Sequence, residues 1–500
     1  MIRSFLLTLA LVPSSLAQTP VDVTPAAVDL VRAFALDPTD ARHLVCESAG
    51  SVYESHDDGS SWSVVAGLPP AGSKLVAFDA DGALLVGASS SFTSSPGSLQ
   101  RRTATGFMDV ALPVQLGVAF NERLRGVVCH PVDPNVMALN LGGIVSGSIF
   151  SERVVATLDG GATWFEVAAR THPSFDPFYG VLATRFVATP DGGRLLLWDL
   201  YSDSSTWRRW VRLVRLDPLD DELVLNPGEQ SNADVRAPRT APGTLLGWRQ
   251  YGPGFTPGSI LERDASGTWS PIHAASTVTH MACSHIDPQL VVATGVDGVG
   301  CIGVSRDGGV SWTTLADFAG TPFDCFQLEH DLDLSSDDSY VYGRVRVSNP
   351  QTRLLRMELE TPLSTPECSG TVNSTGRAGQ LVAVGVAAAS ENRLHLGVRH
   401  LPAGASFLPL VARDAGFTPS PGGSDGDLCL GSPIGRANDA VGMATPWGEG
   451  HAQLDVTRLP RPSTTAAALA GETWRFQVWY RDTASPGASN LTGSIAMTFE

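Results

Sequence analysis

The sequence predicts an all-β protein, with a single β-propeller followed by a small antiparallel β-sandwich. Three octapeptides of one design, Ser/Thr-x-Asp-x-Gly-x-Ser/Thr-Trp, recur at Ser55–Trp62, Thr157–Trp164 and Ser305–Trp312. Their aspartates are spaced by about 100 and about 150 residues, which is two and three units of about 50 residues, a length typical of propeller blades. The 51 glycines and 34 prolines supply turns without the strict period of a fibrous protein.

Each octapeptide is predicted to form the tight turn of a β-hairpin. The aspartate accepts hydrogen bonds from the amides of the turn, the glycine two residues later adopts a positive φ, and the tryptophan packs under the hairpin. An Asp-Pro pair precedes each octapeptide, at residues 37–38, 133–134 and 287–288, and confirms the phase of the repeat, with a longer internal loop in the unit that contains residues 133–134. We therefore expect a structural role for Ser55, Asp57, Gly59, Trp62, Thr157, Asp159, Gly161, Trp164, Ser305, Asp307, Gly309 and Trp312.

The propeller is expected over residues 18–360, and this region divides into units of similar length. These units are 25–68, 74–113, 122–170, 180–226, 233–275, 278–319 and 324–360, and each holds several short β-runs between turn residues. Seven blades are the favoured count, while six and eight remain compatible with the pattern. A strand from residues 19–27 that completes the last blade would remove an exposed sheet edge.

The Asp-Pro pair, the β-run and the octapeptide together resemble the Asp-box (BNR) repeat of sialidase-like, sortilin-like and xyloglucanase-like β-propellers, over residues 25–360. In those families the Asp-box is a structural turn away from the catalytic face, so the resemblance implies no catalytic role for its aspartates. Sialidase-like catalysis would need three arginines, a tyrosine nucleophile paired with a glutamate, and an aspartic acid. Tyr342 and Arg344 are candidates for the nucleophile and the clamp, although both also fit an ordinary alternating strand.

The first 17 residues have the features of a secretory signal peptide. A charged end at Arg3 is followed by the apolar run 5–11 and by a small-x-small site at residues 15–17. No later stretch is long and apolar enough to span a membrane. The mature protein is therefore expected to be secreted, either extracellular or on the cell surface, and to be a monomer.

Charge and motif content exclude several classes of partner. The net charge of −17 opposes binding to nucleic acids. The chain has no Gly-x-Gly-x-x-Gly or Walker motif and no Cys-x-x-Cys or His-x-x-x-His spacing, so no cofactor and no metal are expected. The acidic segment 329–338 could offer calcium ligands, but it lacks the glycine and the terminal glutamate of a calcium loop, which favours a solvated turn.

A linker is predicted at residues 361–367, and a second domain at 368–500. Leu394, Leu396 and Val398 alternate with polar residues or glycine, as do Trp474 and Phe476, which predicts half-buried strands of a small sandwich. This region resembles a C-terminal module of many exported bacterial proteins.

Seven cysteines are distributed over both predicted domains. Cys368 and Cys429 are the two of the C-terminal domain and are expected to form a disulfide, because the protein is exported. Cys129 and Cys283 stand at the same place before an Asp-Pro pair and are expected to be small core residues of equivalent first strands. Cys301 and Cys325 could form a bridge, and the state of Cys46 is left open.

Two functions of different classes are compatible with this sequence. The first is an exported, non-catalytic propeller that binds a glycan, a polymer or a protein partner through the loops of one face. The second is an exported glycoside hydrolase of the sialidase-like superfamily. The signature of the fold is present and that of catalysis is missing, which favours the first.

Overall fold

The computed structural model describes residues 18–26, 28–68, 72, 74–88, 97–113, 120–146, 149–172, 180–189, 192–203, 206–225, 231–236, 245–251, 259–264, 267–274, 278–296, 301–318, 328–348, 351–359, 363–484 and 488–500. The predicted signal peptide lies outside these residues. The described part of the chain is all-β, and none of its helices is long and apolar enough to cross a bilayer.

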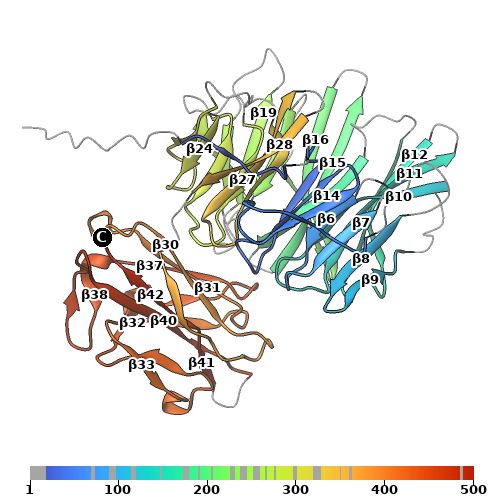
Figure 1. Cartoon of the computed structure of the whole chain (residues 1–500). Helices are drawn as coiled ribbons and strands as arrows, with labels where there is room; N and C mark the ends of the chain where they lie inside the picture. Colours follow the sequence, from blue (N-terminus) through green and yellow to red (C-terminus); the bar gives the residue numbers. More distant parts are fainter. Residues whose placement is uncertain are drawn as a thin grey trace, which may run out of the picture.

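The first part of the chain forms antiparallel sheets that follow one another along the sequence (Figure 1). Most of them hold four strands, and β14–β17 and β18–β21 are joined into one sheet by a single parallel pairing, Arg208 with Ser231. The strands are β1 (Val21–Asp22), β2 (Ala33–Leu36), β3 (Leu44–Ser48), β4 (Ser51–Ser55), β5 (Ser63–Val64), β6 (Lys74–Phe78), β7 (Leu84–Ala88), β8 (Ser98–Thr103), β9 (Gly106–Val110), β10 (Phe120–Cys129), β11 (Met137–Ser146), β12 (Ile149–Thr157), β13 (Phe165–His172), β14 (Gly180–Thr189), β15 (Gly192–Asp203), β16 (Thr206–Leu216), β17 (Leu219–Leu225), β18 (Ser231–Arg236), β19 (Leu245–Tyr251), β20 (Ser259–Arg263), β21 (Trp269–Ala274), β22 (Met281–Cys283), β23 (Val291–Thr294), β24 (Ile302–Ser305), β25 (Thr313–Ala316), β26 (Leu328–Leu334), β27 (Tyr340–Ser348) and β28 (Gln351–Glu358).

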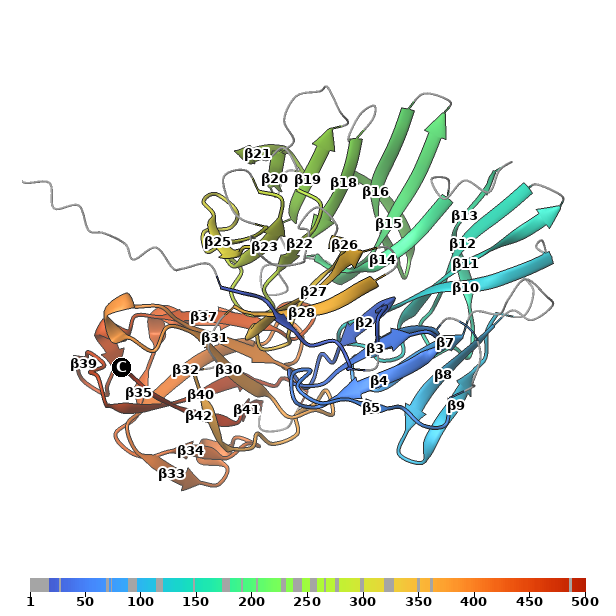
Figure 2. The ribbon, with the colours of Figure 1, turned by 45° about the horizontal axis from the view of Figure 1, so that its top comes forward.

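The first strand of each four-strand unit lies at the centre of this arrangement. Strand β6 contacts both β2 and β10, β10 contacts β14, and β22 contacts both β18 and β26. Together these strands line one cavity. The sheets are thus arranged around a common axis as in a β-propeller (Figure 2), as the repeat predicted.

The two ends of the propeller sequence meet in one sheet. Strand β1 pairs with β28, with Val21 opposite Arg356, and gives the sheet of β26, β27 and β28 its fourth strand. This pairing confirms the strand expected from residues 19–27. Without it, β28 would present an unpaired edge.

The three octapeptide turns have the same hydrogen bonds. In each, the aspartate Oδ1 accepts the backbone N–H of the Ser or Thr four residues later, with N–O distances of 2.8 Å for Ser61, Thr163 and Ser311. The glycine of each turn has a positive φ, between 83° and 96°. Each tryptophan packs against residues of the preceding sheet or, for Trp62, of the last one.

Each octapeptide turn is also bonded to the turn that carries the Asp-Pro pair. The backbone N–H groups of Asp58, Gly160 and Gly308 donate to the carbonyls of Arg42, Asn135 and Gln289, at 3.1, 2.9 and 2.9 Å. This bond gives a physical reason for the common phase of the two sequence markers.

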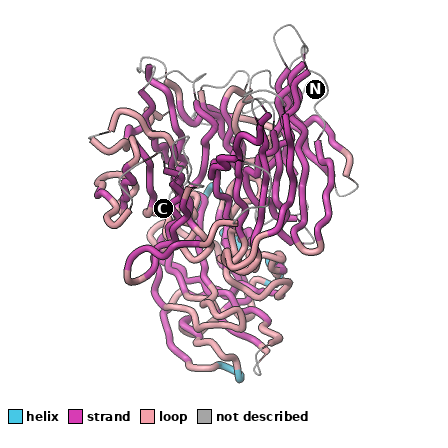
Figure 3. The backbone as a smooth tube through the Cα atoms, turned by 90° about the vertical axis from the view of Figure 1, so that its right-hand side faces the viewer, coloured by secondary structure: helices cyan, strands magenta, loops and turns pink. Residues whose placement is uncertain are grey.

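The C-terminal part of the chain holds two larger antiparallel sheets that share one core. One sheet is built on β29, β42, β40, β32 and β35, and the other consists of β30, β31 and β37. Strands predominate in both parts of the chain (Figure 3). The strands are β29 (Thr365–Cys368), β30 (Gln380–Gly385), β31 (Leu394–Arg399), β32 (Ser406–Ala412), β33 (Ala415–Thr418), β34 (Leu428–Leu430), β35 (Gly435–Arg436), β36 (Gly442–Met443), β37 (Gly450–Leu454), β38 (Leu459–Pro460), β39 (Thr465–Ala466), β40 (Thr473–Arg481), β41 (Ser489–Leu491) and β42 (Ser494–Thr498), and the short 3-10 helices are η2 (Ala389–Glu391), η3 (Pro421–Gly423), η4 (Asn438–Ala440) and η5 (Val456–Arg458). Since β29 begins at Thr365, the sheet starts inside the predicted linker.

The apolar residues of β31 face the domain core, as the alternating pattern predicts, but the residues between them are not exposed to solvent. Leu394, Leu396 and Val398 belong to the core. His395 and Arg399 are nevertheless buried as well, so that every residue of β31 is buried. The expectation of a half-buried strand is therefore wrong for β31, because its second face packs against the propeller.

Candidate functional site

The axis of the propeller contains a cavity of about 490 Å³. Strands β2, β6, β10, β14, β18, β22 and β26, or the residues that directly follow them, contribute to its wall. Most of these first strands are edge strands of their sheets, and together they surround the axis, which leaves a space between them as in other propellers.

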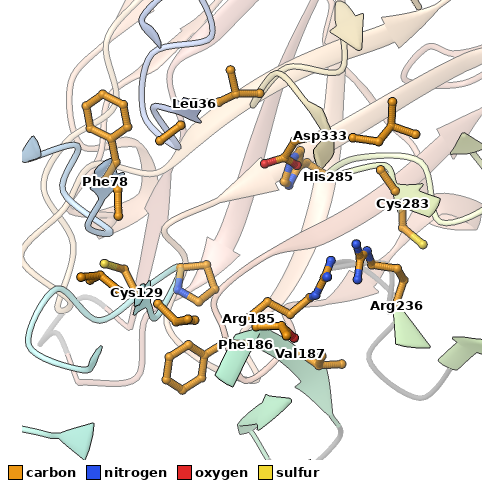
Figure 4. A pocket seen from close by; sticks show the side chains of 18 of the residues that line it. Leu36, Phe78, Cys129, Arg185, Phe186, Val187, Arg236, Cys283, His285 and Asp333 are labelled. Carbon is orange, nitrogen blue, oxygen red and sulfur yellow. The ribbon is translucent and has the colours of Figure 1, made fainter. Parts of the chain in front are cut away.

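The wall of this cavity holds both cationic and apolar side chains. Figure 4 shows Arg185 and Arg236 with their guanidinium groups turned toward the same part of it, and Leu36 and Phe78 lie on the opposite side of the view. The guanidinium of Arg236 is held in place by the bond from Nε to the carbonyl oxygen of Met281, at 2.7 Å. The cavity thus combines an apolar wall with fixed positive charge in a protein whose net charge is −17.

Two cysteines line the cavity at matching places. Cys129 is the last residue of β10, and Cys283 is the last residue of β22, so the two do occupy equivalent first strands as expected. They face the cavity, however, and are not enclosed by core residues alone. Burial raises the pKa of each thiol to about 12, which makes both poor nucleophiles at neutral pH.

The C-terminal domain covers one end of the cavity. Trp447, between β36 and β37, is part of the cavity wall, and its ring lies 5.3 Å from that of His130, just after β10. A Cβ atom at Gly193 would meet the His130 ring and lie 3.1 Å from Trp447 Cζ2. Because Gly193 has no side chain, the rings of His130 and Trp447 can pack against its backbone.

Further contacts attach this domain to the turns between first and second strands of the propeller. Arg377 pairs with Asp81, and Arg399 donates to the carbonyl oxygen of Ser336. These turns lie at the same end of the sheets as the octapeptides. The C-terminal domain thus contacts the octapeptide face of the propeller.

Asp338 lies under this interface and does not form the solvated turn expected for the acidic segment. It is fully buried and accepts hydrogen bonds from Ser284 Oγ and from the backbone N–H groups of His285, at 2.9 Å, and Ile286, at 3.1 Å. Burial raises the pKa of Asp338 to about 7, although these bonds oppose the shift. The expectation of a solvated turn is wrong for Asp338, because its hydrogen-bond donors come from a different sheet, whereas Asp333 of the same segment is exposed. The side chains of Glu329 and Asp331 lie outside the described residues.

Tyr342 and Arg344 are both on β27, but they do not line the cavity wall that the structure describes. Tyr342 is fully buried with Val23, Leu44 and Leu354, between the first and the last sheets. Burial raises the pKa of its phenol. Arg344 donates to the carbonyl oxygen of Arg32.

A charged network that the sequence did not reveal lies in the first sheet. His43 donates from Nδ1 to Asp37, at 2.7 Å, and from Nε2 to Glu54, at 2.8 Å, and Arg102 also binds Glu54. Burial opposes the charge on His43, but the two carboxylates raise its pKa to about 9. The network therefore holds an imidazolium at neutral pH.

The cysteines of the C-terminal domain are joined as expected. Cys368 and Cys429 form a disulfide that closes a sequence separation of 61 residues. Cys46 is a buried free thiol, Cys301 is buried, and Cys325 lies outside the described residues.

Comparisons with known proteins assign no activity to the chain. No family model matches it, and no curated protein matches it. Similar solved structures include YCF48 in complex with a peptide (14% identity, 69% of this chain and 99% of that chain, TM-score 0.44) and an oligogalacturonate lyase in complex with manganese (12%, 69% and 94%, 0.48). A xyloglucanase from Xanthomonas campestris is also similar (14%, 93% and 80%, 0.38).

Proposed function

We propose that this protein is an exported, non-catalytic propeller that binds a partner at its axial cavity. The ring has seven blades, one for each first strand around the axis, and its turns are of the Asp-box type. The C-terminal domain is a β-sandwich that closes the octapeptide face. The protein acts as a monomer.

The partner carries an anionic group, as in an acidic glycan, a polymer or the acidic side chain of a protein. The observation that carries this proposal is the pair Arg185 and Arg236 in the wall of the cavity. Guanidinium groups bind carboxylates with planar, two-pronged hydrogen bonds, and such bonds are stronger in a cavity that excludes water. The apolar wall near Leu36 and Phe78 would contact the uncharged part of the same ligand. Because Trp447 stands at one end, the ligand enters from the face opposite the C-terminal domain.

The composition of the cavity supports binding over hydrolysis. Among the described residues of its wall, Asp333 is the one carboxylate, whereas glycoside hydrolysis ordinarily uses two. Tyr342 is enclosed by core residues. The sialidase-like hydrolase remains the second candidate, because its substrate carboxylate would also be held by arginines.

One experiment separates the two candidates. Purified full-length protein is screened on an array of neutral and carboxylated glycans and, in parallel, with fluorogenic glycosides that include a sialoside. We expect retention of carboxylated glycans without turnover. Turnover of the sialoside by the wild-type protein would refute the binding function and favour the hydrolase.

A pair of arginine variants tests the site itself. Arg185→Gln removes a cavity charge, and we expect its affinity for the retained glycan to fall by roughly 10-fold or more. Arg215→Gln is the matched control, since Arg215 pairs with Asp220 away from the cavity, at 3.0 Å. Equal affinity of both variants would exclude the cavity as the binding site.

Export is part of the same proposal. The disulfide between Cys368 and Cys429 supports it, because such bonds persist in oxidising compartments. We expect the mature protein outside the cell, beginning at Gln18. N-terminal sequencing of the secreted and cell-associated fractions tests this, and an intact Met1 on cytoplasmic protein would contradict it.

A further inference from the structure

Two histidines and an aspartate meet between the propeller and the C-terminal domain. In the register of β31 and β37, Gly397 is opposite His451, so His395 is the diagonal neighbour of His451 on one face of the sheet. That face is the one packed against the propeller, where Asp287 lies in the turn between β22 and β23. The cluster therefore forms only when the two domains are in contact.

The three side chains are within reach of a common centre. His395 Nδ1 lies 2.9 Å from His451 Nε2, and His395 Nε2 lies 3.7 Å from Asp287 Oδ2. One ligand atom from each residue can be chosen so that all three lie within 4.8 Å of one another. The backbone N–H of Gln289 donates to Asp287 Oδ1, at 2.9 Å, which holds the carboxylate with Oδ2 toward His395.

We propose that Asp287, His395 and His451 bind a divalent transition metal ion, with Zn²⁺ as the preferred ion. Imidazole nitrogens suit zinc and its neighbours, whereas calcium and magnesium need sites built from oxygen ligands. Bonds of about 2.0–2.2 Å in a tetrahedral zinc site place the ligand atoms roughly 3.3 Å apart. One nitrogen of His395 would bind the ion, and the three ligand atoms, which lie within 4.8 Å of one another, would move slightly closer together around it. Water would provide the fourth ligand. This proposal does not depend on the proposed function of the axial cavity.

The second cluster of this kind is a poor metal site and therefore serves as a control. His43, Glu54 and His56 also lie close together, but both ring nitrogens of His43 are bonded to carboxylates. The guanidinium of Arg102 is ion-paired with the carboxylate of Glu54 and would repel a metal cation. The cluster at the interface has no such cation among the described contacts of its carboxylate.

A metal at the interface would link the two domains. Its ligands come from the turn after β22 on one side and from β31 and β37 on the other. Because an ion that binds only the docked state stabilises that state, Zn²⁺ should raise the temperature at which the domains separate.

The test uses the untagged full-length protein after dialysis against a chelator. The protein is titrated with Zn²⁺ by calorimetry, and Co²⁺ is added separately to record the absorption of a tetrahedral complex. We expect one ion per chain. His451→Ala should lower the Zn²⁺ affinity by roughly 100-fold or more, whereas His56→Ala in the second cluster should leave it unchanged.

A conservative variant guards against a folding defect. Asp287→Asn keeps the shape of the side chain and the acceptor for Gln289, so its melting temperature without metal should be close to that of the wild type, while its Zn²⁺ affinity falls. A wild-type protein that binds neither ion, or a His451→Ala variant with wild-type affinity, would overturn the proposal.

Discussion

Replacing Trp447 by alanine should weaken the attachment of the C-terminal domain to the propeller. Trp447 is 4% exposed, lines the axial cavity and has its ring 5.3 Å from that of His130. It is not a member of the hydrophobic core of its own domain. The variant should therefore leave each domain folded and act on the contact between them.

The size of the effect follows from the surroundings of the indole. Truncation of a buried Phe or Trp to Ala costs about 3–5 kcal/mol, depending on how well the site can collapse. One side of Trp447 faces the cavity and has fewer packed neighbours, so we expect the lower end, about 3 kcal/mol. That is a change of about 150-fold in the docking equilibrium.

Differential scanning calorimetry of the full-length protein measures this loss. We expect Trp447→Ala to separate the unfolding of the C-terminal domain from that of the propeller and to expose the segment near residue 363 to limited proteolysis. Trp479→Ala is the matched control, because Trp479 lies on the side of β40 that faces away from the main core of the C-terminal domain. Unfolding and protease resistance of Trp447→Ala equal to those of the wild type would refute the reasoning.

Three further predictions concern the interface, a turn and the charged network. Gly397→Val places a side chain where even a Cβ would lie 2.9 Å from Ile286 Cγ2, so we expect it to undock the C-terminal domain, and an unchanged protease pattern would contradict this. Thr157→Val removes the oxygen that accepts the N–H of Gly161 at 3.0 Å, and it should lower the free energy of unfolding by about 1–3 kcal/mol in a denaturant titration. His43 has a folded pKa of about 9 against an ordinary 6.5, so its stabilisation is fully present below pH 6.5 and is lost as the pH rises through 9. The loss is at most about 3 kcal/mol, and denaturant titrations from pH 6 to pH 10 should show it in the wild type but not in His43→Gln.

The propeller could be predicted because its turns are fixed by local bonds. Asp57 bonds to residues at most four positions away, so the octapeptide itself supplies the hydrogen-bond partners of its aspartate. The spacing between such turns then indicates where successive sheets lie along the sequence. The same reasoning found the strand at 394–399 from its alternation.

The axial cavity could not be predicted in this way, because its residues come from separate strands. Arg185 and Arg236 each stand in an ordinary β-run, and only the closure of the ring brings them together. The burial of His395 and Asp338 was missed for the same reason, since their partners lie in another domain or another sheet. A strand pattern shows which side chains share a face but not what covers that face.

The pairing of β1 with β28 also has a consequence for biosynthesis. The two strands are adjacent in space but stand at opposite ends of the propeller sequence. The ring of sheets therefore cannot close until residue 356 has left the ribosome. Until then, the earliest residues must wait unpaired, next to the predicted leader.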